Sequence, residues 1–226
     1  VGVPAHRRVI PDPAAATEGV ASTMAALHAT VRDDATVVRL SPDALREVAR
    51  QPVADLVEYR LGRIAEWSDP RYALDERFVA LSLLVDRGED AAAGRWGRGE
   101  KRYANLHEVL DDTADPALVL LGPPGCGKST LLRRFELDTA VEGLREARQA
   151  VTFFVPLNMY RPERPGDPAP DPGTWLAAQW AASFPALPAL DQMLAEGQVV
   201  LLLDGLNEIP HRGPADCREL ILGWKQ

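Results

Sequence analysis

The stretch that decides the fold is Leu118-Val-Leu-Leu-Gly122-Pro-Pro-Gly-Cys-Gly127-Lys128-Ser129-Thr130. It fits the pattern G-x-x-x-x-G-K-[ST]; an apolar run that predicts a buried strand precedes the loop, and a run that predicts a helix follows it. Glycines let the backbone of such a loop curl until successive N–H groups point at one anion, and the helix N-terminus adds the positive end of its dipole. The segment therefore predicts a phosphate-binding loop between a strand and a helix.

This loop assigns expected roles to its residues. Lys128 is expected to reach the β- and γ-phosphates of a nucleoside triphosphate and to act in catalysis, and the Ser129 hydroxyl is expected to bind Mg²⁺. The expected cofactors are ATP or ADP with Mg²⁺. A Gly-rich turn that binds nothing is the alternative, and the flanking strand and helix patterns argue against it. The expected nucleotide-binding residues of the loop are Gly122, Pro123, Pro124, Gly125, Cys126, Gly127, Lys128, Ser129 and Thr130.

The second half of the site is expected at residues 198–208. The apolar run Gln198-Val-Val-Leu-Leu-Leu203 predicts a buried strand that delivers the carboxylate of Asp204 to Mg²⁺. Glu208 follows a few residues later and is predicted to position or activate the attacking water as a catalytic residue. A turn-capping role for Asp204 and a solvent-exposed position for Glu208 are the alternatives, because spacing alone does not fix where these side chains point.

Composition bounds the class of protein. The chain has 226 residues, of which 46% are hydrophobic and 26% charged, as in an ordinary globular protein. Its net charge of −8 argues against wholesale binding to nucleic acid or to a membrane surface, and no apolar run is long enough to span a bilayer. Cys126 lies inside the loop, which favours a reduced, cytoplasmic setting over a structural disulfide. The start at Val1 and a helix scarcely begun at Gln226 indicate a piece of a longer protein.

Elsewhere helical and strand patterns alternate. Strands alternating with helices predict an α/β fold, a P-loop NTPase with a parallel sheet flanked by helices, preceded by a mainly helical N-terminal region. Its chemistry should lie at the carboxyl ends of the strands. Residues 78–85 have strand composition, with a helix as the alternative, and residues 87–101 and 161–173 are expected to be loops, although the second of these, rich in proline, is alternatively a ligand for a partner. Helices are expected at residues 17–31, after the cap Ser41 and up to Pro52, then at 53–69, 103–110, 131–144, 175–184, 190–196 and 215–224, and strands at 118–121, 150–157 and 198–203.

At this point the chain resembles a known family. Asp204-Gly205-Leu206-Asn207-Glu208-Ile209-Pro210, preceded by Leu201 to Leu203, resembles the Walker B segment of NACHT domains, in which a small residue follows the Mg²⁺ aspartate. Gly122 to Thr130 resembles the family's Walker A loop, and Asn207 joins the implied nucleotide-binding residues. The resemblance covers roughly residues 70–226. It divides the chain into an N-terminal region of unknown role (1–69), a segment leading into the NTPase domain (70–115) and the N-terminal part of a NACHT-type NTPase domain (116–226).

The resemblance implies a signalling ATPase of the STAND class, bacterial in type and related to AAA+ enzymes. In that class a trigger ligand changes the nucleotide state. The protein then oligomerises through its NTPase domain and engages an effector domain of the same longer chain, with slow ATP hydrolysis. Bacterial members are often implicated in defence against phage, so a phage-derived trigger is one expectation. An AAA+-like motor and a scaffold with a structural nucleotide are the alternatives. Gly205 after Asp204 favours the switch, because motors of that class usually have Glu there.

Two departures from the family pattern carry expectations of their own. Asn207 stands where the family commonly has an acid, which implies less efficient hydrolysis. The family's next strand, which lies between the Walker A and Walker B strands, does not occur before Gln226. The sheet made by these residues is therefore expected to be incomplete, with a gap at its centre.

Overall fold

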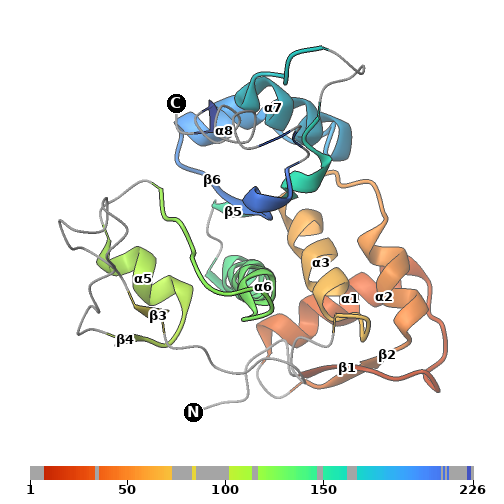
Figure 1. Cartoon of the computed structure of the whole chain (residues 1–226). Coiled ribbons are helices and arrows are strands. Elements are labelled where there is room, and N and C mark those ends of the chain that lie inside the picture. The colour runs from red at the N-terminus through yellow and green to blue at the C-terminus, as the bar shows by residue number, and fades with distance from the viewer. Residues whose placement is uncertain are drawn as a thin grey trace.

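The computed structural model describes residues 8–33, 36–72, 83–84, 102–113, 117–146, 150–161, 167–209, 211, 213 and 223–224, and Figure 1 shows their arrangement. Helices and strands alternate through most of this part of the chain. The helices are α1 (Val20–Arg32), α2 (Pro42–Ala49), α3 (Leu56–Trp67), α5 (Leu106–Asp112), α6 (Lys128–Glu146), α7 (Pro172–Ser183) and α8 (Leu190–Ala195), with 3₁₀ turns η3 (Leu157–Met159) and η4 (Leu206–Glu208). The strands are β1 (Val9–Pro11), β2 (Val38–Leu40), β3 (Leu83–Leu84), β4 (Arg102–Tyr103), β5 (Val151–Pro156) and β6 (Val199–Asp204).

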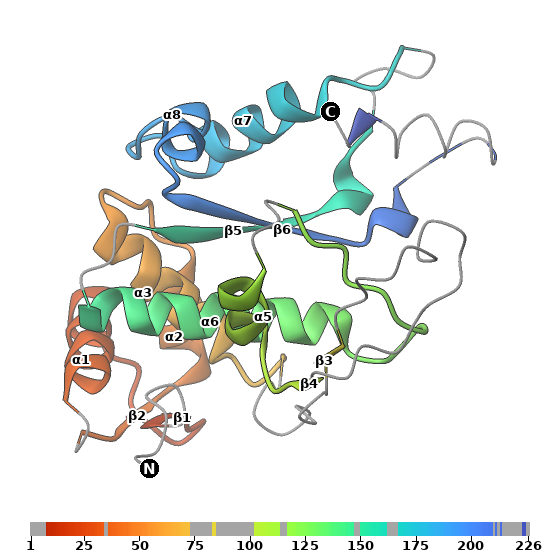
Figure 2. The same cartoon turned by 90° about the vertical axis from the view of Figure 1, so that its left-hand side faces the viewer.

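The central element is the parallel pair of β5 and β6, which runs in register from Val151 opposite Val199 to Pro156 opposite Asp204. Figure 2 shows α7 and α8 above this pair and α3 and α6 below it. Both strands are rich in apolar residues, as expected for strands that are covered on both faces. The layered arrangement agrees with the predicted α/β class, with two strands in this sheet rather than the three that the sequence predicts.

The third expected strand, Leu118–Leu121, does not form. This segment runs as extended chain outside any strand, and Leu118, Val119 and Leu121 are 40%, 74% and 57% exposed. A strand needs a neighbour that takes up its backbone hydrogen bonds and elements that cover its apolar side chains. Within the described residues β6 pairs with β5 alone, so the segment beside the loop has neither, and the prediction of a buried strand there is wrong for this structure.

The helices of the N-terminal region lie close to their predicted ranges, although α3 begins at Leu56, after the cap Asp55, and not at residue 53. Ser41 caps α2, its hydroxyl accepting a hydrogen bond from the Ala44 N–H at 3.1 Å, and Pro42 occupies the first helical position. Asp55 caps α3 in the same way, accepting from the Val57 N–H at 2.8 Å. The parallel pair β1–β2 in this region was not predicted, because three-residue strands are too short to give a period-two pattern.

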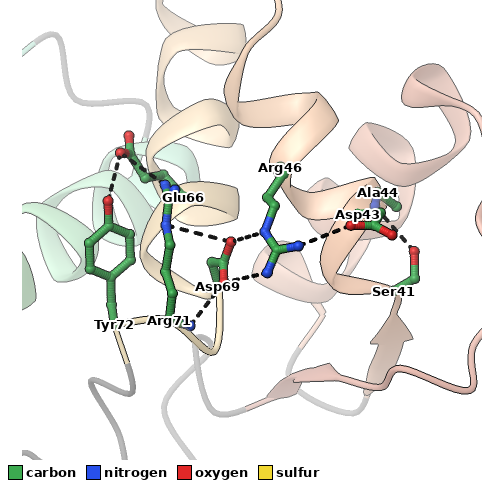
Figure 3. Close-up of polar contacts among 8 residues, drawn as sticks. All are labelled: Ser41, Asp43, Ala44, Arg46, Glu66, Asp69, Arg71 and Tyr72. Atoms are coloured by element: carbon green, nitrogen blue, oxygen red, sulfur yellow. Dashed lines mark hydrogen bonds and ion pairs between the residues drawn. The ribbon is translucent and has the colours of Figure 1, made fainter.

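Arg46 links α2 to the residues that follow α3 (Figure 3). Arg46 donates from its Nε to the Oδ2 of Asp69 at 2.6 Å, and from its Nη1 to Asp43 at 3.0 Å. Asp69 also accepts from the Arg71 N–H at 2.9 Å, just past the end of α3. The predicted stop of this helix at Asp69-Pro70 is thus confirmed, since α3 ends at Trp67 and the Asp69 carboxylate then binds a side chain and a turn N–H.

One hydrophobic core joins the N-terminal region to α6. Packing of α6 against α1 and α3 forms this core, so the helix that follows the loop lies on residues from before position 70. The buried residues that α6 contributes to this core are Leu137, Ala140, Val141 and Leu144. Those from the N-terminal region are Val9, Leu27, Val31, Leu40, Leu45, Val48, Leu61, Ile64, Ala65 and Trp67.

Three predicted segments lie wholly or mainly outside the described residues: the strand at 78–85, of which only β3 is described, the loop at 87–101, and the helix at 215–224, of which only 223–224 are described. β3 pairs antiparallel with β4. The short helix predicted from Tyr103 begins later, at Leu106, because Tyr103 belongs to β4 and Asn105 caps α5 by accepting from the Glu108 N–H at 2.9 Å. Among the described helices none is both long and apolar enough to cross a membrane.

Candidate nucleotide-binding site

The loop between Gly122 and Lys128 has the backbone that its glycines predict. Gly125 and Gly127 have φ values of 76° and 94°, in the left-handed region that favours glycine. At Gly122 a side chain is excluded for a different reason, because a Cβ atom there would lie 2.7 Å from the Sγ of Cys126. The loop therefore curls tightly before α6 begins at Lys128.

Lys128 is folded over its own loop. Its Nζ donates to the carbonyl oxygens of Gly122 at 2.8 Å and Pro123 at 3.1 Å, and lies 3.8 Å from the Sγ of Cys126. A lysine ammonium that reaches the β- and γ-phosphates must exchange these carbonyl contacts for phosphate oxygens. In this structure the backbone of the loop therefore holds the ammonium group, next to the curl that the sequence predicts as the phosphate site.

Ser129 and Asp204 meet at the carboxyl end of β6. The Ser129 hydroxyl, in the first turn of α6, donates to the Oδ1 of Asp204 at 2.8 Å, and both residues are partly buried. Asp204 is the last residue of β6, directly opposite Pro156 in the pair. The structure thus brings together the two side chains that the sequence predicts as Mg²⁺ ligands, from positions far apart in the chain.

These two oxygens fit Mg²⁺. The ion takes oxygen ligands in an octahedral arrangement and is usually held by one or two protein groups together with waters and phosphate oxygens. Within the described residues no group of three or more His, Cys, Asp or Glu side chains gathers that would form an all-protein metal site. One hydroxyl beside one carboxylate, next to a curled Gly-rich loop, fits the way in which a nucleotide-bound Mg²⁺ is held, and the assignment of Ser129 and Asp204 as its ligands stays a prediction.

Glu208 and Asn207 lie in η4, just beyond Asp204, and both are exposed. Gly205 turns the chain there with a φ of 78°, and the Glu208 N–H donates to its carbonyl at 2.7 Å. The Glu208 carboxyl folds back over this glycine, because a Cβ atom at Gly205 would lie 3.2 Å from its Oε2. Among the described side chains no hydrogen bond joins Glu208 or Asn207 to Lys128, Ser129 or Asp204, so their catalytic and nucleotide-binding roles stay predictions.

The remaining loop residues are exposed or partly buried. Pro123 and Pro124 are exposed, and Thr130, which follows Ser129 in α6, is partly buried. The site is open to solvent. The cavity of about 290 Å³ in this structure lies elsewhere, between the end of α2, α3, β5 and the end of α7, where Tyr59, Phe153 and Phe184 contribute to its wall.

Sequence reasoning missed a buried carboxyl in the same helix. Glu136 is fully buried, and its Oε2 accepts a hydrogen bond from the Trp67 Nε1 at 2.8 Å while its Oε1 accepts from the Thr152 hydroxyl at 3.3 Å. One signal was available in the chain: Glu136 stands between Phe135 and Leu137, and one helical turn before Ala140. That spacing puts an acid on the apolar side of α6.

Two features define a P-loop NTPase. One is a Gly-rich loop that leads into a helix, and the other is a hydroxyl of that helix that lies next to the acidic residue at the end of a parallel strand. Comparison with known proteins identifies a family within this class. Residues 117–226 match the model of the NACHT family, described as the NACHT domain, and this part of the chain belongs to that family of P-loop NTPases. Neither a curated protein nor a solved structure matches the chain.

Membership of the family carries a general function. NACHT domains are nucleoside triphosphatases of the STAND class, so residues 117–226 form an NTPase domain that binds a nucleotide, usually with Mg²⁺. The matched range begins just before the loop and includes both Ser129 and Asp204. The prediction of a NACHT-domain P-loop NTPase is thereby confirmed.

Proposed function

We propose that the protein binds ATP with Mg²⁺ at the loop of residues 122–130 and hydrolyses it slowly as a signalling switch. The observation that carries this proposal is the 2.8 Å hydrogen bond between Ser129 and Asp204. A hydroxyl and a carboxylate held this close would hold one cation together, and Mg²⁺ bound there would supply positive charge to the phosphates of the nucleotide. ADP occupies the same loop in the resting state.

The residues of the chain divide the work between binding and chemistry. Lys128 leaves the carbonyls of Gly122 and Pro123 to neutralise charge on the β- and γ-phosphates. Glu208 orients the attacking water and accepts its proton. Asn207, an amide beside it, orients water by hydrogen bonds and contributes no charge. The position of Glu208 over Gly205, at the end of the strand that carries Asp204, supports this division.

The switch is the part of the proposal that rests on the family class. A trigger ligand, such as one of phage origin, shifts the nucleotide state. The NTPase domains then self-associate in the cytoplasm, and an effector domain elsewhere in the longer chain is engaged, in bacterial defence against phage. The left-handed backbone at Gly205 supports a switch over a continuous AAA+-like motor, because the Glu that motors usually carry there would be strained at a φ of 78°.

Calorimetric titration of the full-length protein with Mg·ATP tests nucleotide binding. Lys128→Ala removes a charge-assisted contact to phosphate and is expected to weaken the affinity at least tenfold. Asp191→Asn, at an exposed acid of α8, is the control and should bind as the unaltered protein does. Equal affinity in the unaltered protein and Lys128→Ala would sink the proposal.

A further inference from the structure

The buried Glu136 carboxyl joins three elements at one point. It belongs to α6, accepts from Trp67 of α3 through one oxygen at 2.8 Å and from Thr152 of β5 through the other at 3.3 Å. The indole of Trp67 is fixed in turn by edge-on packing against the rings of Tyr72 and Phe154. A single carboxyl thus ties the N-terminal region to both the helix and the strand of the NTPase domain.

The two NTPase elements held by Glu136 are the ones that place the candidate site. α6 begins with Lys128 and carries Ser129 in its first turn, about 10 Å along the helix from Glu136 at the usual rise per residue. β5 pairs with β6, with Thr152 opposite Val200, and β6 ends in Asp204. The distance between Ser129 and Asp204 therefore depends on how α6 sits against β5, which is the contact that Glu136 makes.

We propose that Glu136 is a positioning residue that couples the N-terminal region, through Trp67, to the nucleotide-binding loop, and that its protonation state sets the strength of this coupling. The proposal rests on the nucleotide-binding function proposed above. It gives the region before residue 70 a role, because Trp67 then acts on the geometry of a site to which it contributes no side chain.

The charges around Glu136 make its protonation state sensitive to pH. Burial raises the pKa of Glu136 to about 7, and Glu66 adds to the rise, while Arg63 and the hydrogen bonds from Trp67 and Thr152 lower it. Of the other groups facing it from α3, Tyr59 has its own pKa raised by burial and by Glu136. On α6 the Arg133 guanidinium lies over the Trp67 ring, 5.6 Å from its centroid.

The neutral and ionised forms of Glu136 differ in the free energy needed to keep the carboxyl buried. In the neutral form the carboxyl proton is donated to the Thr152 hydroxyl, which accepts as readily as it donates, and the Trp67 bond is kept without a buried charge. In the ionised form the charge is buried beside Arg63, whose Nη1 is already paired with Glu66 at 2.7 Å. Loosening of the α3–α6 contact admits water to the carboxylate, so we expect nucleotide affinity to fall as Glu136 ionises.

Linkage fixes the sign of the effect on folding. Because the folded-state pKa of about 7 lies above the ordinary value of 4.5, the folded protein holds a proton that the unfolded chain has lost between these pH values. The contribution of Glu136 to the free energy of unfolding is greatest below pH 4.5. It falls as the pH rises to about 7 and does not change further above that pH. A role in packing alone predicts this stability effect and no pH-dependent difference in nucleotide affinity.

The test compares full-length variants by calorimetric titration with Mg·ATP from pH 6 to 8.5. Glu136→Gln keeps the shape and both hydrogen bonds of the neutral form, so it should match the unaltered protein at pH 6 and bind about threefold to tenfold more tightly at pH 8.5. Trp67→Phe removes a bond that favours the charged form and should shift the fall in affinity to higher pH. Glu142→Gln, the same change elsewhere on α6, is the control. It also measures the part of the pH dependence that comes from protonation of ATP and is common to all variants.

Thermal unfolding of the same proteins over the same pH range separates this inference from the proposed function. Glu136→Gln should flatten the pH dependence of the unfolding midpoint, and Glu142→Gln should not. An identical pH profile of affinity in Glu136→Gln and the unaltered protein overturns the positioning role, even when the unfolding midpoints differ. Absence of ATP binding by the unaltered protein at every pH overturns the proposed function and the positioning role together, and leaves the unfolding result as a separate measure of whether Glu136 titrates.

Discussion

The Ser129 hydroxyl donates a hydrogen bond of 2.8 Å to the Oδ1 of Asp204, although the two residues lie 75 positions apart. The contact joins the first turn of α6 to the last residue of β6, at the edge where the strand pair ends. Between them the described chain runs through the rest of α6, then β5, η3, α7 and α8, and returns along β6 to the loop. The pair is accordingly the most direct target for testing the site.

Removing either member of the pair should weaken Mg·ATP binding. Asp204→Asn takes away the charge that we propose binds the metal, and Ser129→Ala takes away the hydroxyl that we propose as its second ligand. Each loss is expected to cost about 1.5–3 kcal/mol, roughly a tenfold to hundredfold drop in affinity. The double variant should lose less than the sum of the two, because both side chains serve one ion. Calorimetric titration of the full-length protein, with and without Mg²⁺, measures all three.

Asp191→Asn serves as the control here too, because it makes the same change at an exposed acid of α8. Strict additivity of the two single losses would contradict a shared ion. An unchanged dependence on Mg²⁺ in Asp204→Asn would contradict the assignment of Asp204 as a ligand.

Glu208→Gln should bind ATP normally and hydrolyse it at least about a hundredfold more slowly, because an amide cannot take the proton of the attacking water. In a switch protein the ATP-bound state, and with it the oligomer, should then last longer once the trigger is present. Asn207→Asp should raise turnover modestly. Single-turnover hydrolysis on the triggered full-length protein is the measurement, with the exposed Glu196→Gln as control. If Glu208→Gln hydrolyses ATP as fast as the unaltered protein, a different residue positions the attacking water.

Two helical glycines should respond in opposite ways to alanine. At Gly62 of α3 a Cβ atom meets nothing within 4 Å, so Gly62→Ala should stabilise the fold by about 0.5–1 kcal/mol through helix propensity. At Gly143 of α6 a Cβ atom would lie 2.5 Å from the Nε of Arg60, a buried side chain that also donates to the Ala150 carbonyl at 3.3 Å. Displacing it should cost about 1–3 kcal/mol.

Urea unfolding of the two alanine variants measures the difference directly. The pair is matched because both changes are made inside helices, and only one of them meets a neighbour. A gain in stability in Gly143→Ala equal to that in Gly62→Ala would contradict close packing of Arg60 between α3 and α6.

The sequence by itself determined the features that depend on near neighbours in the chain. Ser41 caps its helix with a side chain three residues from the N–H group that it binds, so a short pattern was enough to identify it. The loop from Gly122 to Ser129 is equally local, since its glycines supply backbone angles that other residues avoid. These signals, with helical spacing and the strand composition of residues 150–157 and 198–203, predicted most of the helices, β5, β6 and the NTPase class. The roles of the site residues stay predictions.

Tertiary structure decided the features that need a distant partner. Leu118–Leu121 has the composition of a buried strand, and within the described residues no neighbouring strand pairs with it, so it stays extended and exposed. The spacing of Glu136 puts it on the apolar side of α6, but its hydrogen-bond partners, Trp67 and Thr152, come from the remote elements α3 and β5. Composition and periodicity report what a side chain prefers. Backbone pairing and burial depend on which remote segments pack against it, and that is fixed only when the chain has folded.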